Sequence, residues 1–254
     1  MKSFGNYLLI VIVMFIASCK ESSTEQPFEL NPLLTEEMVN NVSLDPGVRV
    51  DSINLKAGIV WDYAISVPEI QNGEEVPLII GLHGGPLGTG SGKGYLNCLA
   101  NLGFRKLNAI IFAPYAGDYY FWDENNYSLI LTLIDYAKKY WPINENKIVV
   151  SGYSNGGIAS WFFGVEYPDF FSAAIPVASN YDSNKKLQIP FYVIHGDRDQ
   201  TFPLSDMQDL VTSLTNNGSD IQLFVMEGYG HDVACEYYYA LTLSSDWLLN
   251  EVWK

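Results

Sequence analysis

Positive charge is scarce in this sequence of 254 residues. It has 14 Lys and Arg against 29 Asp and Glu, a formal net charge of −15, and no run of Lys or Arg longer than two. Because nucleic-acid binding needs clustered cations that neutralise phosphates, we expect no nucleic-acid partner. Charged residues make up only 17% and hydrophobic residues 48%, which predicts a folded domain with a sizeable core rather than a disordered chain.

Metal-binding patterns are also missing. The sequence has three histidines and three cysteines, with no C-x-x-C and no H-E-x-x-H, so we expect neither a metal site nor a cofactor. The glycine-rich run at 88–94 (GTGSGKG) does not form a phosphate-binding loop, because Lys93 is followed by Gly94 instead of Ser or Thr. We interpret this run as a flexible rim of a loop.

The N-terminus lacks an apolar run long enough to span a membrane, since Tyr7 to Ile16 gives only about ten residues. The run follows Lys2, and its length and the positive start are typical of a secretory signal. Ile16-Ala17-Ser18-Cys19 resembles the lipobox of bacterial lipoproteins, although an ordinary signal peptide stays open as the alternative. The resemblance implies cleavage before Cys19 and acylation of that residue.

This interpretation divides the chain into a signal peptide at 1–18, a loosely ordered tether at 19–45 and one folded domain at 46–254. The protein would be exported and held on a membrane, on the periplasmic or cell-surface side, through a lipid on Cys19. Two cysteines then remain, Cys98 and Cys235. In an oxidising compartment they are compatible with one disulfide, and two separate buried thiols remain equally open.

Strands and helices are expected to alternate from Val76 onward, which predicts an α/β fold with a mostly parallel sheet and helices on both faces. The segment between Val177 and Phe191 is too short for a lid domain. Strands are expected at Val48–Lys56, Ile59–Val67, Val76–Leu82, Ala109–Ala113, Lys147–Ser151, Ala173–Val177, Phe191–Ile194 and Ile221–Met226, and helices at Tyr95–Lys106, Leu129–Tyr140, Ile158–Glu166, Leu204–Thr215 and Glu236–Asn250.

The pentapeptide Gly152-Tyr153-Ser154-Asn155-Gly156 stands between a predicted strand and a predicted helix. A sharp turn there exposes a serine hydroxyl at a helix N-terminus, and side chains at Gly152 or Gly156 would press on neighbouring elements. A G-x-S-x-G match alone has little specificity, but few chance matches have this strand-to-helix setting. Ser154 is therefore the candidate nucleophile.

A serine nucleophile needs a base and an acid. Of the three histidines, only His231 follows both Ser154 and a candidate acid, and it lies in a loop after the last strand; His83 and His195 are expected to brace turns. Asp199 lies further into the loop of His195-Gly196-Asp197-Arg198-Asp199 than Asp197, which we expect to cap the turn or pair with Arg198. The order Ser154, Asp199, His231 is the one that α/β-hydrolases use.

Two backbone N–H groups would have to stabilise an oxyanion. We expect the N–H of Asn155, directly after the nucleophile, and that of Gly85 in the early His-Gly-Gly loop. Pro86 cannot serve because it has no N–H.

Four linked segments carry a family resemblance: GLHGGP, VVSGYSNGGIAS, VIHGDRDQTFP and GYGHD. In this order and spacing they resemble lidless α/β-hydrolase esterases, with the polyhydroxybutyrate depolymerase/feruloyl esterase and phospholipase/carboxylesterase groups the most similar. The resemblance covers roughly 76–253. It implies a serine esterase with Ser154 as nucleophile, Asp199 as acid, His231 as base, and Asn155 and Gly85 as oxyanion donors.

Exposed aromatic residues near such a site suggest stacking on the substrate. Tyr119, Tyr120 and Trp122 follow one central strand, and Tyr229 precedes His231; they favour an aromatic or carbohydrate-linked ester, although simple loop packing explains them equally well. Two other functions stay open: a prolyl-oligopeptidase-type serine peptidase, and a non-catalytic binding lipoprotein.

Overall fold

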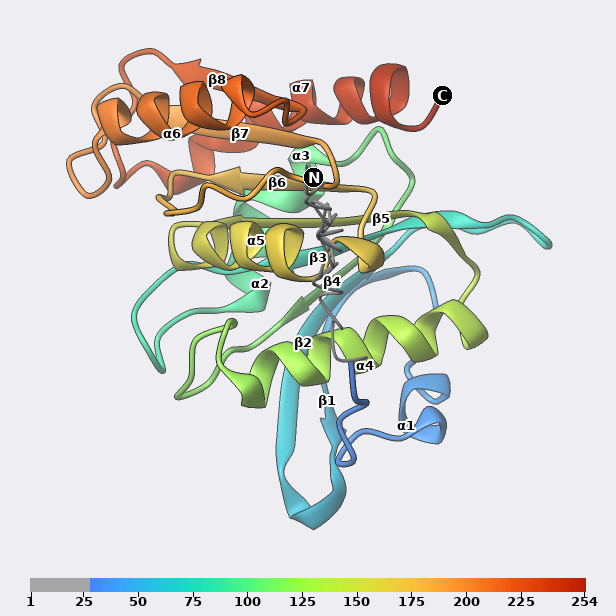
Figure 1. Cartoon of the computed structure of the whole chain (residues 1–254). Coiled ribbons are helices and arrows are strands. Elements are labelled where there is room, and N and C mark those ends of the chain that lie inside the picture. Colours follow the sequence, from blue (N-terminus) through green and yellow to red (C-terminus); the bar gives the residue numbers. More distant parts are fainter. Residues whose placement is uncertain (1–27) are drawn as a thin grey trace, which may run out of the picture.

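The computed structural model describes residues 28–254 and forms one eight-stranded sheet with helices on both faces (Figure 1). The expected signal peptide and Cys19 lie outside the described residues. The strand order is β1-β2-β4-β3-β5-β6-β7-β8; β2 pairs antiparallel with β1 and β4, and all other pairs are parallel. The strands are β1 Gly47–Asn54, β2 Val60–Val67, β3 Val76–Leu82, β4 Ile110–Pro114, β5 Ile143–Tyr153, β6 Ala173–Val177, β7 Phe191–Gly196 and β8 Ile221–Met226.

The predicted α/β fold with a mostly parallel sheet is confirmed. The main helices are α1 Glu36–Asn40, α2 Gly92–Tyr95, α3 Asn101–Gly103, α4 Glu124–Tyr140, α5 Asn155–Glu166, α6 Leu204–Asn216 and α7 Tyr238–Trp247. The π-helical turn η2 (Leu96–Ala100) joins α2 to α3, the 3-10 turn η4 (Ala234–Tyr237) precedes α7, and the π-helical turn η5 (Leu248–Val252) follows it.

The core lies in two layers, one on each face of the sheet, as the alternation of strand side chains requires. Along β3, Leu78, Ile80 and Leu82 point into one layer and Ile79 into the other. The first layer holds the buried faces of α4, α5 and α6, and the second those of η2 and α7. Because β3 is covered on both faces, all seven of its residues are buried, which explains its continuous apolar sequence.

The expected loose tether at 19–45 is corrected for residues 28–45, because they pack against the first core layer. Leu34, Val39 and Val42 are at most 7% exposed, and the indole N–H of Trp141 donates to the carbonyl of Val39 over 3.1 Å. Burial of each such side chain stabilises a fold by roughly 1.5–3 kcal/mol. Residues 28–45 are therefore part of the domain.

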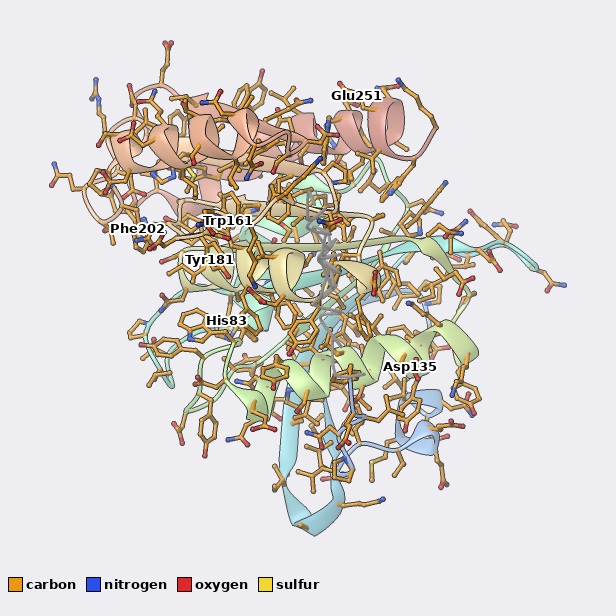
Figure 2. The ribbon with its side chains drawn as sticks, in the orientation of Figure 1. His83, Asp135, Trp161, Tyr181, Phe202 and Glu251 are labelled. Atoms are coloured by element: carbon orange, nitrogen blue, oxygen red, sulfur yellow. A yellow bond between two sulfur atoms is a disulfide. The ribbon has the colours of Figure 1, made fainter. Side chains whose placement is uncertain are left out.

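No lid covers the sheet within the described residues. Between β6 and β7 the chain runs for 13 residues without a helix or strand, and its Tyr181 stacks on Trp161 of α5, with ring centroids 5.7 Å apart (Figure 2). Nor does the described part of the chain hold a helix that is long and apolar enough to cross a membrane.

Candidate active site

Ser154 lies in the sharp turn between β5 and α5. Its backbone has φ 56° and ψ −119°, a conformation that residues with a side chain seldom adopt, and its N–H donates to the carbonyl of Val177 over 3.0 Å. A Cβ on Gly152 would lie 2.2 Å from the carbonyl oxygen of Gly156, and one on Gly156 would lie 2.0 Å from that of Leu82. Both glycines are therefore required by the close approach of backbones, as expected.

His231 lies between Ser154 and Asp199 and contacts both. Its Nε2 is 2.9 Å from Ser154 Oγ, and its Nδ1 is 2.8 Å from Asp199 Oδ2. The other carboxylate oxygen of Asp199 accepts the N–H groups of Thr201 at 2.8 Å and Phe202 at 2.9 Å. The three expected residues are thus brought into one hydrogen-bonded chain, although they are up to 77 residues apart in sequence.

These contacts define where the protons lie. A carboxylate can only accept hydrogen bonds, so Nδ1 of His231 carries the proton that faces Asp199. Nε2 then has a free lone pair toward Ser154, and the serine hydroxyl donates to it. The Asp199 side chain is fully buried whereas that of His231 is 21% exposed, so the acid is shielded from water and the base is open to the cavity. This is the arrangement that proton transfer from the serine requires.

The other two histidines brace turns, as expected. The ring of His83 accepts the N–H of Ala116 at Nε2 over 3.1 Å, and its Nδ1 contacts the carbonyl of Gly84 at 3.0 Å. His195 contacts the carbonyl of Phe202 through Nε2 at 2.8 Å. Burial lowers the pKa of both rings below the usual 6.5, so both remain neutral donors to these carbonyls.

Asp197, the rejected candidate acid, caps the turn, as expected. Its Oδ1 accepts the backbone N–H of Gly228 over 2.6 Å, and the side chain is exposed. It thereby fixes the start of the loop that leads to His231 while making no contact with the imidazole. The two aspartates of this turn therefore have separate tasks.

The two oxyanion candidates, Asn155 and Gly85, both line the cavity at Ser154 and contact each other. The side-chain amide of Asn155 donates to the carbonyl of Gly85 over 2.8 Å, and Gly85 has φ +103°, a conformation that glycine adopts readily. No hydrogen bond within residues 28–254 takes up the N–H of Gly85, and the N–H of Asn155 is at the first position of α5, where it has no partner within the helix. Asn155 also orients the loop that carries the second donor, a contact that the sequence did not predict.

A cavity of about 620 Å³ opens at Ser154 and His231. Of the four aromatic residues expected to bind substrate, Tyr120 alone lines it. Trp122 stacks on Tyr120, with ring centroids 4.5 Å apart, without lining the cavity itself. Tyr119 is half exposed and lies beside the cavity. Tyr229 is instead half-buried and packs edge-on against Tyr237, which belongs to the second core layer. Substrate binding by these four residues stays a prediction, and only Tyr120 has a place in the wall of this cavity, because proximity along the chain did not reveal where each side chain points.

Several lining residues were missed in the sequence. Phe202 stands edge-on to the His231 ring at 5.3 Å, and Tyr95, Tyr153, Cys98 and Leu99 form an apolar wall. Phe202 lies in the same VIHGDRDQTFP segment as Asp199, and this proximity could have marked it as a residue of the site. Figure 2 shows Phe202 at the same end of the sheet as His83. The wall residues come from the α2–η2 segment and the nucleophile turn, and their sequence resembles that of ordinary core.

No group of side chains suited to hold a metal ion is found within residues 28–254. Cys98 and Cys235, for which the sequence allowed either one disulfide or two separate buried thiols, form a disulfide.

The fold and this site define the class of protein: an α/β-hydrolase in which a serine, a histidine and an aspartate form one hydrogen-bonded chain. The model described as the Dienelactone hydrolase family matches residues 116–240, just under half of the chain, and that segment contains all three residues. A curated relative, "Protein usf" of Aquifex pyrophilus, is 24% identical over 102 residues, which are 39% of this chain and 44% of the relative. The match thus spans less than half of that protein's length.

Solved structures share the fold. FphF, described as a fluorophosphonate-binding serine hydrolase of Staphylococcus aureus, superposes with a TM-score of 0.67 and 16% identity, covering 82% of this chain and 100% of that one. Esterase 2 of Thermogutta terrifontis gives 0.62 and 18%, covering 80% and 94%. A protein described as a thermostable esterase gives 0.64 and 22%, covering 80% of this chain but 62% of its own.

Proposed function

We propose that the protein is a serine esterase that cleaves carboxylic esters through an acyl-enzyme. The observation that carries the proposal is the position of His231, within 2.9 Å of Ser154 Oγ and 2.8 Å of Asp199, at the edge of an open, largely apolar cavity. The family match and the esterases among the structural neighbours support the same chemistry.

In the proposed mechanism Ser154 Oγ attacks the ester carbonyl carbon while its proton passes to Nε2 of His231. Asp199 stabilises the imidazolium that forms. The negative charge on the carbonyl oxygen is met by the N–H groups of Asn155 and Gly85. His231 then protonates the leaving alcohol, and a water molecule, deprotonated by the same imidazole, releases the acid and restores Ser154.

The substrate class is inferred from the cavity. Tyr120, supported by its stacking on Trp122, offers an aromatic wall, and Phe202 forms a second one beside His231. Aromatic rings bind both aromatic acyl groups and the apolar faces of sugars. The short connection between β6 and β7 leaves the mouth open, so we propose an aromatic or carbohydrate-linked ester as substrate.

Hydrolysis of p-nitrophenyl acetate tests the activity. Ser154→Ala or His231→Ala should lower turnover on the order of 10⁶-fold. Ser154→Ala should also abolish labelling by a fluorophosphonate probe, with Ser151→Ala, a neighbouring buried serine outside the cavity, as the control that keeps it. A Ser154→Ala protein that hydrolysed the ester at the wild-type rate would refute the proposal.

A substrate panel tests the class. It should contain short and long acyl esters, feruloyl esters, acetylated xylan, hydroxybutyrate oligomers and dipeptide amides. Preference for feruloyl or acetyl-xylan esters would support the inference from Tyr120, and a Tyr120→Ala variant should then raise KM for those substrates more than for p-nitrophenyl acetate. Faster cleavage of amides than of esters would instead identify a peptidase, and failure of every substrate and of the probe would identify a binding lipoprotein.

We also propose that the protein is exported and anchored to a membrane by acylation of Cys19. The lipobox-like sequence supports this location, and so does the Cys98–Cys235 disulfide, because disulfides persist mainly in oxidising compartments. Metabolic labelling with an alkyne fatty acid should modify the full chain, and Cys19→Ala should abolish the label and release the protein from the membrane fraction. Unchanged labelling of Cys19→Ala would contradict the proposal.

A further inference from the structure

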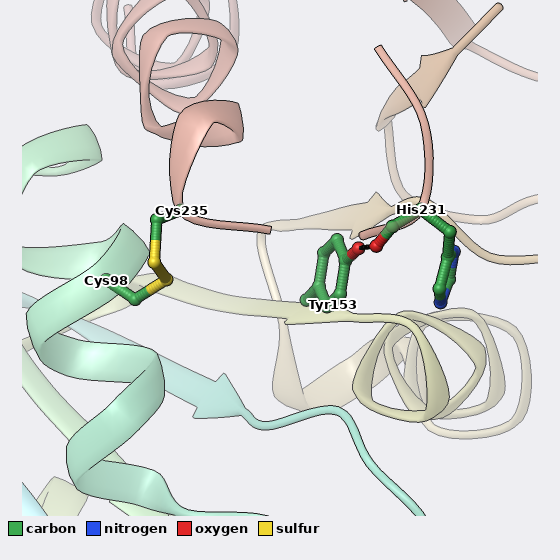
Figure 3. The surroundings of a disulfide bond; sticks show 4 residues. All are labelled: Cys98, Tyr153, His231 and Cys235. Atoms are coloured by element: carbon green, nitrogen blue, oxygen red, sulfur yellow. Dashed lines mark hydrogen bonds between the residues drawn. A yellow bond between two sulfur atoms is a disulfide. The ribbon is translucent and has the colours of Figure 1, made fainter. Parts of the chain in front are cut away.

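The loop that carries His231 has neither helix nor strand between β8 and η4, yet its base must be held to a fraction of an ångström. Three consecutive carbonyls of the loop accept hydrogen bonds, two from other parts of the domain and one from Tyr237 in η4, the turn that follows the loop. The backbone N–H of Arg198 donates to Tyr229 at 2.9 Å, the hydroxyl of Tyr237 donates to Gly230 at 3.2 Å, and the hydroxyl of Tyr153 donates to His231 itself (Figure 3). Arg198 and Tyr153 hold the loop before and at the histidine, and Tyr237 ties Gly230 to the turn that follows the loop.

The disulfide holds the other side of the loop. Cys235 comes only four residues after His231 and is bonded to Cys98 of η2 (Figure 3). The residues between them are half-buried or exposed and form no helix or strand before Ala234. The covalent bond is therefore the strongest link between the C-terminal side of the His231 loop and the helical segment that packs on the sheet.

The same disulfide joins two segments that both line the substrate cavity. Cys98 and Leu99 line the cavity from η2, and Ala234, next to Cys235, lines it from the other side. Cys235 is exposed and Cys98 half-buried, so a dithiol in solution can reach the sulfurs. A change at the disulfide is thus transmitted over four residues to the base and directly to the surface that meets the substrate.

We propose that the Cys98–Cys235 disulfide is a positioning element of the active site, whose reduction lowers turnover by loosening the His231 loop while the domain stays folded. The proposal rests on the esterase function proposed above. The step is a two-electron exchange: an external dithiol reduces the disulfide to two thiols and becomes a disulfide itself. The oxidised enzyme is the active form, and activity is matched to an oxidising compartment.

Turnover of p-nitrophenyl acetate before and after dithiothreitol treatment tests the proposal. We expect kcat to fall by about 10- to 100-fold, since a displacement of about 1 Å costs that much, and re-oxidation to restore it. Cys98→Ala combined with Cys235→Ala should reproduce the loss without reductant. Dithiothreitol should have no further effect on this double variant, which is the control for action elsewhere in the protein.

A second comparison separates positioning from general stability. Leu214→Ala in α6 removes a fully buried side chain in the opposite core layer, so it should lower Tm while leaving kcat unchanged at temperatures where the protein is folded. If the double cysteine variant behaves in the same way, with a lower Tm and kcat within twofold of wild type, the proposal is wrong. Tyr153→Phe should lower kcat through the same loop, and its effect should be non-additive with that of the double variant.

The loop can also be followed without any substrate. The proton on Nδ1 of His231 is held by Asp199, so its NMR signal should broaden or disappear on reduction if the loop loosens. An unchanged signal would overturn the proposal. This reading is independent of ester hydrolysis, so an enzyme that cleaves no ester refutes the proposed function, whereas a reduced protein with an intact His231 signal refutes the role of the disulfide.

Discussion

Asp199 makes three hydrogen bonds, and replacing it with asparagine should change only one of them. Oδ1 of the amide can still accept the N–H groups of Thr201 and Phe202, but an NH₂ group replaces the oxygen that faces Nδ1 of His231. A flip of the amide would place the NH₂ against two N–H donors, so this orientation is favoured. His231 must then accept at Nδ1 and carry its proton on Nε2.

This tautomer cannot take the proton of Ser154, so turnover should fall by roughly 10⁴, as it does when the same change is made in other triads. At about 1.4 kcal/mol per factor of ten, the loss corresponds to about 5 kcal/mol of transition-state stabilisation. The free energy of unfolding should change by less than about 1 kcal/mol, because the two loop hydrogen bonds remain.

Asp199→Ala provides the contrast. It should lose similar turnover and a further 1–3 kcal/mol or so of stability, because the N–H groups of Thr201 and Phe202 are left without a partner. The assay pairs kcat on p-nitrophenyl acetate with urea unfolding of each variant. An Asp199→Asn enzyme within tenfold of the wild-type kcat would refute the assignment, and Asp197→Asn, which alters only the capped turn, is the matched control expected to retain activity.

Three further predictions concern stability. Gly156→Ala should destabilise the fold by about 3 kcal/mol or prevent folding, because its Cβ would lie 2.0 Å from the carbonyl oxygen of Leu82. Gly94→Ala should be tolerated, because no atom lies nearer than 3.5 Å to its added Cβ. Denaturant unfolding measures the stability of both variants. Leu34→Ala should cost about 2–5 kcal/mol if the segment before β1 belongs to the domain, and a loss below about 0.5 kcal/mol would argue for a loose tether. Burial lowers the pKa of His195 below 6.5, so the unfolded chain binds the proton more readily than the folded protein. The stability that this residue contributes is therefore present above pH 6.5 and is lost as the pH falls toward its folded-state pKa. Tm should fall more steeply between pH 7 and 5 in wild type than in His195→Gln.

Strands were predicted better than helices, and the reason is physical. β3, β6 and β8 have the predicted bounds. β3 and β6 are buried along their whole length, so their apolar runs mark the strands clearly, whereas β8 is a half-buried strand at the edge of the sheet. α4 begins at Glu124, five residues before the predicted start, because its first turn (ENNY) has no apolar pattern. The helix predicted at 95–106 is instead three short pieces from 92 to 103, starting inside a glycine-rich run that suggested a loop.

In the site, too, features set by short sequence segments could be predicted, whereas features set by tertiary packing could not. Ser154, Asp199 and His231 could be predicted because each follows a strand end, and the fold places those ends at one edge of the sheet. The direction of a side chain within a loop is not encoded locally, so the sequence could not distinguish Tyr229, which packs against the second core layer, from Tyr120, which lines the cavity. The Cys98–Cys235 pairing, across 137 residues, likewise depends on packing alone.

The three histidines differ in their contacts, and under the proposed function two of them brace the backbone while the third is the base. His83 and His195 are buried, donate to backbone carbonyls and have a pKa that burial lowers, so both favour the neutral form. His195 holds Phe202, whose N–H is bound by Asp199, so it braces the acid of the chain as well as its own turn. His231 alone reaches the cavity with a free lone pair. In the proposed mechanism His231 therefore accepts and returns a proton while His83 and His195 keep the surrounding backbone fixed, and the proposed role of the disulfide is to support the loop that carries His231.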